Sequence, residues 1–242
     1  MSGVLDKGER WRVVHGDCID VLRTLPDASV DAVVTDPPYK ISQEYGTTTD
    51  PDNLLAVSSL WPVAAECLRV TRPGGLCAMF YDTRILPLAL RAMPHAGWKY
   101  LRALTLYRRW GNASKLYGWM TTSDLVLIFC RPGAKYAFHG DTHHDVFVRS
   151  HAEEENAKHP AQKPVAFAAQ IVANLCPPGG VVLDPYAGSG TTGVACAQKD
   201  RRFVGIEQDA GYCEIAHRRI AAAAAQPALL FAESAAEAAE KA

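Results

Sequence analysis

Four consecutive residues, Asp36-Pro37-Pro38-Tyr39, place a carboxylate, two rigid carbonyl groups and an aromatic ring one residue after the apolar run 32–34. An acidic residue at the carboxyl end of a buried strand lies where open α/β sheets bind ligands. The two prolines fix φ and lack an N–H, so their carbonyl oxygens are held as acceptors without competing donors. The tyrosine ring can stack on a flat partner. These residues therefore favour a rigid site for a planar ligand that donates hydrogen bonds, although a simple turn could use them for its geometry alone.

A second segment begins at Asp184 and indicates a strand end, a glycine-rich turn and the start of a helix. Gly188, Gly190 and Gly193 match the spacing G-x-G-x-x-G, and Glu207 follows at the end of the next expected strand. Such a turn admits an adenosine-bearing ligand to the backbone, while the carboxylate binds the ribose hydroxyls. Because Asp184 stands just before the turn, it would repel a pyrophosphate. The pattern therefore favours a ligand with a cationic end, carrying an ammonium and a sulfonium, over a nicotinamide dinucleotide.

The elements that must position these segments alternate along the chain. Short β-branched and apolar runs alternate with helical patterns, which is typical of a mostly parallel sheet covered on both faces. Two runs, Tyr100–Tyr107 and Leu125–Cys130, have no helix between them, and we expect them to form an antiparallel pair at a sheet edge. The fold class is therefore α/β, a Rossmann-like three-layer sandwich with a mostly parallel seven-stranded sheet and one antiparallel edge strand. Strands are expected over 12–15, 32–35, 76–81, 100–107, 125–130, 181–183 and 202–206, and helices over 19–25, 53–70, 84–96, 164–175, 191–199 and 210–225.

The composition indicates one globular domain. The chain has 242 residues, of which 48% are hydrophobic, enough for one sizeable core. We expect this domain to span residues 1–225 and a flexible, alanine-rich and acidic tail to occupy 226–242. No stretch offers the roughly 18 consecutive apolar residues that would span a bilayer. The polar start does not resemble a signal peptide, so we expect a cytoplasmic protein without membrane partners.

The cysteines and histidines favour neither a disulfide framework nor a metal site. The seven cysteines are scattered and never spaced as C-x-x-C. Most lie in apolar runs, where cysteine packs as a small hydrophobe, and this indicates a reducing compartment. The histidines and aspartates between His139 and His151 match no standard zinc spacing. We expect a solvated loop there and no metal.

Charge is unevenly distributed, although the net charge is only −1. Between Arg84 and Lys135 nine basic residues stand against one acidic residue, Asp124, so this stretch carries +8. A local basic field attracts a polyanion whatever the total charge. Single members of the set could be ordinary solvated side chains, but the asymmetry of the whole stretch favours a polyanionic partner.

With these motifs in this order, the chain resembles the permuted, β-class amino-methyltransferases of DNA, in which the catalytic segment precedes the cofactor loop. Relatives commonly show a Trp-x-Lys pattern and a His-Glu pair where this chain has Tyr107–Arg109 and Ser123–Asp124, so the departures lie on the target side. The matching segments are Arg12–Cys18, Asp36–Tyr39, His159–Pro164 (H-P-x-x-K-P), Asp184–Gly193 and Val204–Glu207.

The resemblance implies direct in-line methyl transfer from S-adenosylmethionine to the exocyclic amine of a base flipped out of double-stranded DNA. It implies catalytic roles for Asp36, Pro37, Pro38 and Tyr39. Aspartate at the first position is commoner in adenine-N6 enzymes than in cytosine-N4 enzymes, so N6 of adenine is the favoured target. The alternatives are N4 of cytosine, an amine of RNA, and a catalytically inactive nucleic-acid-binding subunit; the intact catalytic acid and loop glycines disfavour the last.

The resemblance also assigns residues to the cofactor from several of the matching segments. Lys163 would neutralise the cofactor's carboxylate or nearby DNA phosphates, and the alternative is a surface lysine at a helix start. The expected cofactor-binding residues are Asp17, Cys18, Asp36, Gln162, Lys163, Asp184, Pro185, Tyr186, Gly188, Ser189, Gly190, Thr191, Thr192, Glu207 and Gln208.

Target recognition is expected from two short loops, 108–122 and 131–158. Their length predicts a short or relaxed target sequence, or readout shared between two subunits, since members of this family are often homodimers. A segment of the tail, Gln226–Phe231, resembles peptides that dock on the replication sliding clamp; the alternative is that Leu229 and Phe231 fold back onto the body. The candidate DNA contacts are Arg108, Arg109, Lys115 and Trp119.

Overall fold

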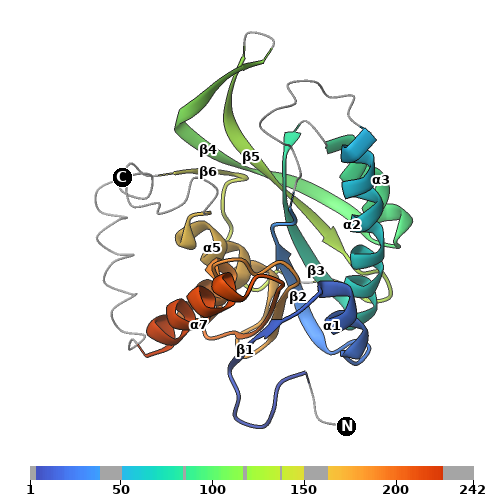
Figure 1. Cartoon of the computed structure of the whole chain (residues 1–242), viewed down its shortest axis with the longest axis vertical. Coiled ribbons are helices and arrows are strands. Elements are labelled where there is room, and N and C mark those ends of the chain that lie inside the picture. The colour runs from blue at the N-terminus through green and yellow to red at the C-terminus, as the bar shows by residue number, and fades with distance from the viewer. Residues whose placement is uncertain are drawn as a thin grey trace.

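An eight-stranded sheet forms the centre of the molecule (Figure 1). The computed structural model describes residues 4–38, 51–83, 86–116, 119–136, 138–149 and 163–225, with the backbone alone over 51–59, 109–116 and 119–121. The strand order is β1-β8-β7-β2-β3-β5-β4-β6, and neighbours are parallel except that β5 runs antiparallel to both β3 and β4. The strands are β1 (Trp11–His15), β2 (Val30–Thr35), β3 (Thr71–Tyr81), β4 (Lys99–Leu116), β5 (Trp119–Cys130), β6 (Val146–Val148), β7 (Val181–Asp184) and β8 (Arg202–Glu207).

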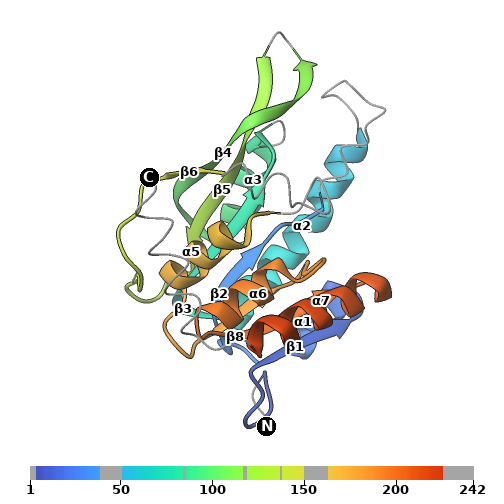
Figure 2. The same ribbon diagram turned by 90° about the vertical axis from the view of Figure 1, so that its left-hand side faces the viewer.

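Helices cover both faces of this sheet and complete three layers (Figure 2). One buried cluster joins the sheet to α5, α6 and α7, and a second joins its other face to α1, α2 and α3. The helices are α1 (Cys18–Thr24), α2 (Pro51–Val70), α3 (Leu86–His95), α5 (Val165–Leu175), α6 (Thr191–Gln198) and α7 (Ala210–Ala224).

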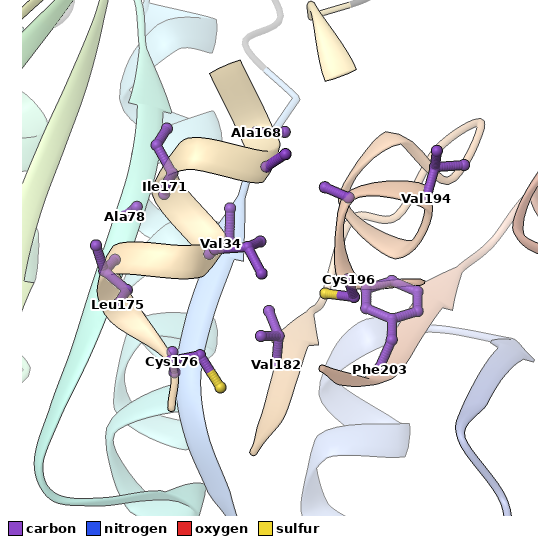
Figure 3. Close-up of a cluster of buried hydrophobic side chains, with 14 of the residues drawn as sticks. Val34, Ala78, Ala168, Ile171, Leu175, Cys176, Val182, Val194, Cys196 and Phe203 are labelled. Carbon is purple, nitrogen blue, oxygen red and sulfur yellow. The ribbon is translucent and has the colours of Figure 1, made fainter. Parts of the chain in front are cut away.

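Alternation along the central strands divides the core between the two faces. In β2, Ala32 and Val34 pack in the cluster with α5 to α7, whereas Val33 packs in the cluster on the opposite face. Figure 3 shows the first cluster, with Val34 of β2 beside α5 and Phe203 of β8 beside α6. Because both faces are covered, the central strands contain consecutive apolar residues, such as 32–34 in β2 and 181–183 in β7, rather than alternating ones.

The Rossmann-like three-layer architecture agrees with the expectation, but the number of strands and the place of the antiparallel strand differ. β5 lies inside the sheet because β4 adds beyond it, and β6 pairs in parallel with β4 to become the edge. Three residues are too few for periodicity to indicate a strand, so β6 could not be expected from the sequence.

The Arg72-Pro73-Gly74-Gly75 segment, which lies between an expected helix and an expected strand, belongs to β3. α2 ends at Val70, as expected, but β3 starts at once with Thr71 rather than at Leu76. The N–H of Gly74 donates to the carbonyl of Arg131, and the Arg131 N–H donates to the carbonyl of Gly75. These two bonds tie the segment to the end of β5 and extend the ladder.

The strands β4 and β5 form a hairpin that extends past the sheet. Their pairing runs from Lys99↔Cys130 to Leu116↔Trp119, whereas β3 follows β5 only as far as Tyr81↔Leu125. Figure 1 shows the two strands rising above the body as an arm. Much of the segment 108–122, expected as a loop, is therefore strand.

The strands β7 and β2 lie side by side at the centre of the sheet, although they are far apart in the sequence. The chain continues from β7 to β8 on one side and from β2 to β3 on the other. Such a reversal opens a crevice at the carboxyl ends of the strands. Asp184 ends β7 and Asp36 follows β2, so the two motifs of the sequence meet in this crevice.

Candidate active site

Asp36 lies just beyond β2, and its carboxylate pairs with Lys163. The lysine Nζ donates to Oδ2 of the aspartate at 2.6 Å, and 15% of the lysine side chain and 32% of the aspartate side chain are exposed. The ammonium also lies 5.3 Å from the centroid of the Phe80 ring. Lys163 immediately precedes Pro164, the N-cap of α5, so the start of this helix brings it to the end of β2.

The glycine-rich turn between β7 and α6 has a left-handed backbone at two positions. Gly188 has φ +51° and Gly190 has φ +82°. A Cβ at Gly190 would lie 2.9 Å from Ala216, so this position packs closely against α7. A Cβ at Gly188 would meet no atom within 4 Å. Gly188 therefore leaves room on the open side of the turn, where a ligand can approach the backbone.

Asp184 is a buried carboxylate at the end of β7, with 3% of the residue exposed. Its Oδ1 accepts a hydrogen bond from the N–H of Tyr186 at 3.1 Å. Burial raises the pKa of Asp184 to about 6; hydrogen bonds from the Thr192 hydroxyl and the Tyr186 N–H oppose the rise, and the charge of Asp36 adds to it. No cation pairs with Asp184 among the described residues. An ammonium group placed here would favour the ionised form that burial disfavours.

Glu207 ends β8 and faces the glycine-rich turn. Its Oε2 accepts from the N–H of Gly188 at 2.8 Å, and its Oε1 accepts from the N–H of Asp209 at 2.9 Å. An ionised carboxylate offers about four acceptor positions. Each oxygen therefore retains one for a ligand, which suits a pair of neighbouring hydroxyl groups.

Two adjoining cavities lie at the crevice. The larger, of about 850 Å³, reaches from the turn to α5 and α7, and the smaller, of about 430 Å³, lies between the turn, the Asp36–Pro38 segment and the ends of β1 and β8. Pockets for small molecules and cofactors range from about 300 to 1,000 Å³. The Asp36–Lys163 pair stands where the two meet, because both cavities are lined by Asp36, Lys163, Tyr186, Gly188 and Tyr212.

Most of the residues expected to bind a cofactor meet in these cavities. Gly190 lies in the turn beside them. Asp17 is not among the described residues that line them; its carboxylate caps α1 by accepting from the N–H groups of Ile19 at 2.8 Å and Asp20 at 3.3 Å. Tyr39 and Gln162 lie outside the described residues. The expected residues that do line a cavity are Cys18, Asp36, Pro37, Pro38, Lys163, Asp184, Pro185, Tyr186, Gly188, Ser189, Thr191, Thr192, Glu207 and Gln208.

The residues expected to contact DNA all belong to the β4–β5 hairpin. Arg108 pairs with Asp124 across the two strands at 3.3 Å, so the one acidic residue of the basic stretch is held by an arginine. Arg109, Lys115 and Trp119 lie farther out along the backbone of the arm. The antiparallel pair expected over 100–107 and 125–130 continues to Leu116↔Trp119, so these residues lie on strands of a projecting hairpin rather than in a loop.

Residues outside the expected motifs also line the larger cavity, among them Phe80 from β3, and Tyr212 and Arg219 from α7. The Phe80 ring packs edge to face against the Phe167 ring, with 5.9 Å between the ring centroids. Nη1 of Arg219 donates to the carbonyl oxygen and the hydroxyl of Ser189. The seven-residue interval from Tyr212 to Arg219 places both on one face of a helix that starts soon after Glu207. That spacing is the signal by which the α7 residues could have been found.

Metal-holding groups, membrane-crossing helices and disulfides are all absent from the described residues. In the described part of the chain, no three His, Cys, Asp or Glu residues are grouped so that they could hold a metal ion; His151 lies outside that part. None of the described helices is long and apolar enough to cross a membrane. The seven cysteines are free thiols, and all are buried except Cys18, which is half-buried in the smaller cavity.

Comparison with known proteins identifies the family. A family model described as DNA methylase, N6_N4_Mtase, matches residues 30–218. The type II methyltransferase M.HpaI of Haemophilus parainfluenzae is 28% identical over 233 residues, covering 86% of this chain and 74% of that protein. The DNA adenine methyltransferase YhdJ of Escherichia coli (strain K12) is 29% identical over 246 residues, covering 88% of this chain and 83% of that protein.

A solved structure has the same fold. The M1.HpyAVI–SAM complex superposes with a TM-score of 0.69 at 24% identity, covering 87% of this chain and 98% of that one. The family model spans well over half of the sequence, and it includes both the segment after β2 and the glycine-rich turn. The chain therefore belongs to the N6_N4_Mtase family of DNA methylases.

Proposed function

We propose that the chain transfers the methyl group of S-adenosylmethionine to N6 of an adenine in double-stranded DNA. The observation that carries this proposal is the position of Asp36, at the junction of a cavity built by the glycine-rich turn and a cavity bounded by Pro37 and Pro38. A carboxylate at this junction can accept hydrogen bonds from an exocyclic amine while the turn holds the methyl donor. Membership of the DNA methylase family supports DNA as the substrate.

The charges and shape of the cavities fit S-adenosylmethionine. This cofactor supplies an electrophilic methyl group on a sulfonium and carries an ammonium at its amino-acid end. In the proposal Asp184 binds the ammonium and Glu207 binds the ribose hydroxyls. The apolar walls of the smaller cavity at Pro185 and Ile206 hold the adenine ring. Gly188 provides the open space beside the turn.

Asp36 and Pro37 act on the target amine. An exocyclic amine of a base is a poor nucleophile because its lone pair is delocalised into the ring. Hydrogen bonds from this amine to the Asp36 carboxylate and the Pro37 carbonyl would favour a pyramidal nitrogen and localise the pair. The base must leave the duplex to reach them, and we expect Tyr39 to stack on it. The rest of the catalysis is positioning and electrostatics.

Adenine is favoured over cytosine by two observations. Aspartate occupies the first position of the tetrapeptide, as in the adenine-N6 enzymes that the chain resembles. A relative that is 29% identical over 246 residues, YhdJ, is a DNA adenine methyltransferase. N4 of cytosine is the second candidate, because the family includes both kinds of amine.

Methyl-labelled cofactor and duplex DNA provide the test. After incubation, the DNA is digested to nucleosides, and label in N6-methyladenine is the expected result. Label in N4-methylcytosine would change the assigned base to cytosine. A parallel incubation with RNA that becomes labelled while the DNA does not would contradict the DNA assignment. Asp36→Ala should abolish transfer while part of the cofactor binding survives. Asp20→Ala, at a carboxylate that is 80% exposed on α1, is the matched control and should retain full activity.

The setting of this activity is part of the proposal. We place the chain in the cytoplasm, on nucleoid DNA, with residues 1–225 as a single methyltransferase domain. A homodimer and a sliding-clamp contact through Gln226–Phe231 stay predictions, and the tail 226–242 lies outside the described residues. Equilibrium sedimentation tests the dimer. A pull-down with sliding clamp, repeated with Gln226→Ala and Phe231→Ala, tests the contact.

A further inference from the structure

Arg219 is a half-buried cation in the wall of the larger cavity, and no described carboxylate pairs with it. Its Nη1 donates to the carbonyl oxygen of Ser189 at 2.6 Å and to the Ser189 hydroxyl at 2.7 Å, and lies 3.5 Å from the hydroxyl of Thr191. Burial lowers the pKa of Arg219, and no acidic neighbour offsets the effect. The guanidinium is therefore held at the turn with its charge uncompensated.

Two other arginines with little exposure show how this protein usually compensates such a charge. Arg69 pairs with Asp27 and Glu66. Arg201 donates to carbonyl oxygens at the C-terminal end of α5, where the helix dipole is negative. Arg219 instead contacts the start of α6, the positive end of that helix. Its position does not stabilise α6 electrostatically, and this leaves its charge available to an anionic ligand.

The other charges of the cavity identify this ligand. The amino-acid end of S-adenosylmethionine is a zwitterion and needs one anionic and one cationic site. Asp184 provides the anionic site. Lys163 is already paired with Asp36 at 2.6 Å. Arg218 also lines the cavity, but it is exposed and makes no hydrogen bond to the turn among the described residues. Arg219 is the cation that remains for the carboxylate.

We propose that Arg219 binds the carboxylate of the cofactor's methionine end, and that Ser189 orients the guanidinium for this contact. The inference rests on the proposed function, since it assumes that S-adenosylmethionine occupies the cavity. Among the described residues only Nη1 of Arg219 is used in hydrogen bonds. The N–H groups of Nη2 and Nε are donors in the fork geometry that a carboxylate matches.

Decarboxylated S-adenosylmethionine tests the assignment because it lacks only this carboxylate. Isothermal titration calorimetry with the full chain gives the affinity for each ligand. The wild type should prefer S-adenosylmethionine by roughly tenfold to a hundredfold, as expected for hydrogen bonds between charged groups. Arg219→Gln should bind the two ligands alike, because the loss falls on the ligand that carries the carboxylate.

Matched variants show whether Arg219 binds the cofactor's carboxylate or only stabilises the glycine-rich turn. Arg218→Gln, one residue away in the same cavity wall, should keep the wild-type preference. If Arg219 only braces the turn, Arg219→Gln weakens both ligands equally and the preference survives, which overturns the proposal. Loss of preference in Arg218→Gln with retention in Arg219→Gln also overturns it. Thermal unfolding checks each variant, and Arg219→Met, which keeps the apolar stem, replaces Arg219→Gln if that variant does not fold.

The same titration keeps this inference distinct from the proposed function. A wild-type chain that binds neither ligand contradicts the proposed function itself. A wild-type chain that binds and prefers S-adenosylmethionine, while Arg219→Gln retains that preference, contradicts only the role of Arg219.

Discussion

The ammonium of Lys163 lies 2.6 Å from the carboxylate of Asp36, where the two cavities of the crevice meet. The resemblance assigned this lysine to the cofactor's carboxylate or to DNA phosphate, but in the structure its partner is the proposed catalytic acid. A charged hydrogen bond of this kind fixes one carboxylate oxygen. We infer that Lys163 sets the orientation of Asp36 before the base arrives.

Replacing Lys163 tests this positioning role. Lys163→Gln should lower kcat by about 100-fold, because a small misplacement of a catalytic group has a cost of that size. The Kd for S-adenosylmethionine should change little. Steady-state kinetics and calorimetry measure the two quantities, with Lys199→Gln, an exposed lysine, as the control. An unchanged kcat with a weakened Kd would return Lys163 to the cofactor.

The raised pKa of Asp184 predicts a pH-dependent stability. The folded pKa is about 6, against an ordinary value of 3.8, so the folded state binds this proton more tightly than the unfolded state. The contribution of Asp184 to the free energy of unfolding is therefore fully present at a pH below the pKa of the unfolded state. It is lost as the pH rises through the pKa of the folded state. Asp184→Asn should remove that loss. Urea unfolding across this pH range measures it, and identical pH profiles for the two proteins would refute the claim.

The same group predicts the pH dependence of cofactor binding. The ammonium of S-adenosylmethionine is attracted by the ionised form of Asp184, so affinity should fall as the pH drops below about 6. Asp184→Asn should bind more weakly at neutral pH and should not show this fall. Calorimetric titrations at a series of pH values measure the effect. A wild-type affinity that stays constant through the same range would place the ammonium elsewhere.

Alanine substitutions at two glycines should differ in their effect on stability: Gly190 lies in the glycine-rich turn, and Gly179 lies just before β7. Both Gly190 and Gly179 have positive φ, but an added Cβ would lie 2.9 Å from Ala216 at the first and would meet nothing within 4 Å at the second. Gly179→Ala should cost about 1–2 kcal/mol from left-handed strain alone. Gly190→Ala should cost about 2–5 kcal/mol, because overpacking adds to the strain. Equal losses in denaturant unfolding would mean that α7 yields to the added methyl group.

The projecting hairpin predicts a salt-dependent DNA affinity. Arg109→Gln and Lys115→Gln should each weaken DNA binding and reduce the slope of log K against log salt by about one. Cofactor affinity should be unchanged, because the arm extends away from the cavity residues. Fluorescence anisotropy at several salt concentrations gives the slope. If the slope stays at its wild-type value, the arm does not contact phosphates.

The fold could be predicted where a local pattern determines it. Buried strands such as Val30–Thr35 and the helices that cover them have continuous or periodic apolar residues, and their bounds were expected to within a few positions. The sheet edge could not be predicted, because β6 has only three residues and its pairing with Thr105–Tyr107 depends on tertiary contacts. The extension of the hairpin past Asp124 also depends on cross-strand pairing rather than on periodicity.

The residues of the site likewise differ in whether a local sequence pattern indicates them. Asp36 follows a buried strand, and Asp184 and Glu207 end such strands, so their position together with the glycine-rich pattern predicted that all three line the crevice, as the structure shows. Arg219 and Phe80 were not found, because each enters the cavity through packing between distant elements. The partnership of Lys163 with Asp36 was also missed, since the motif that contains the lysine suggested a ligand contact instead of an internal one.

The pairing of β2 with β7 has a consequence for synthesis of the chain. β2 and β3 can pair as soon as both have left the ribosome, but the other side of β2 has no neighbour until Val181–Asp184 emerges. β1 likewise waits for β8. An unpaired central strand is a template for association with other chains. A product terminated before residue 181 would therefore contain Asp36, the proposed catalytic residue, without the glycine-rich turn, and one side of β2 would stay unpaired and open to association. Both the solubility of the chain and its proposed activity then depend on the final quarter of translation.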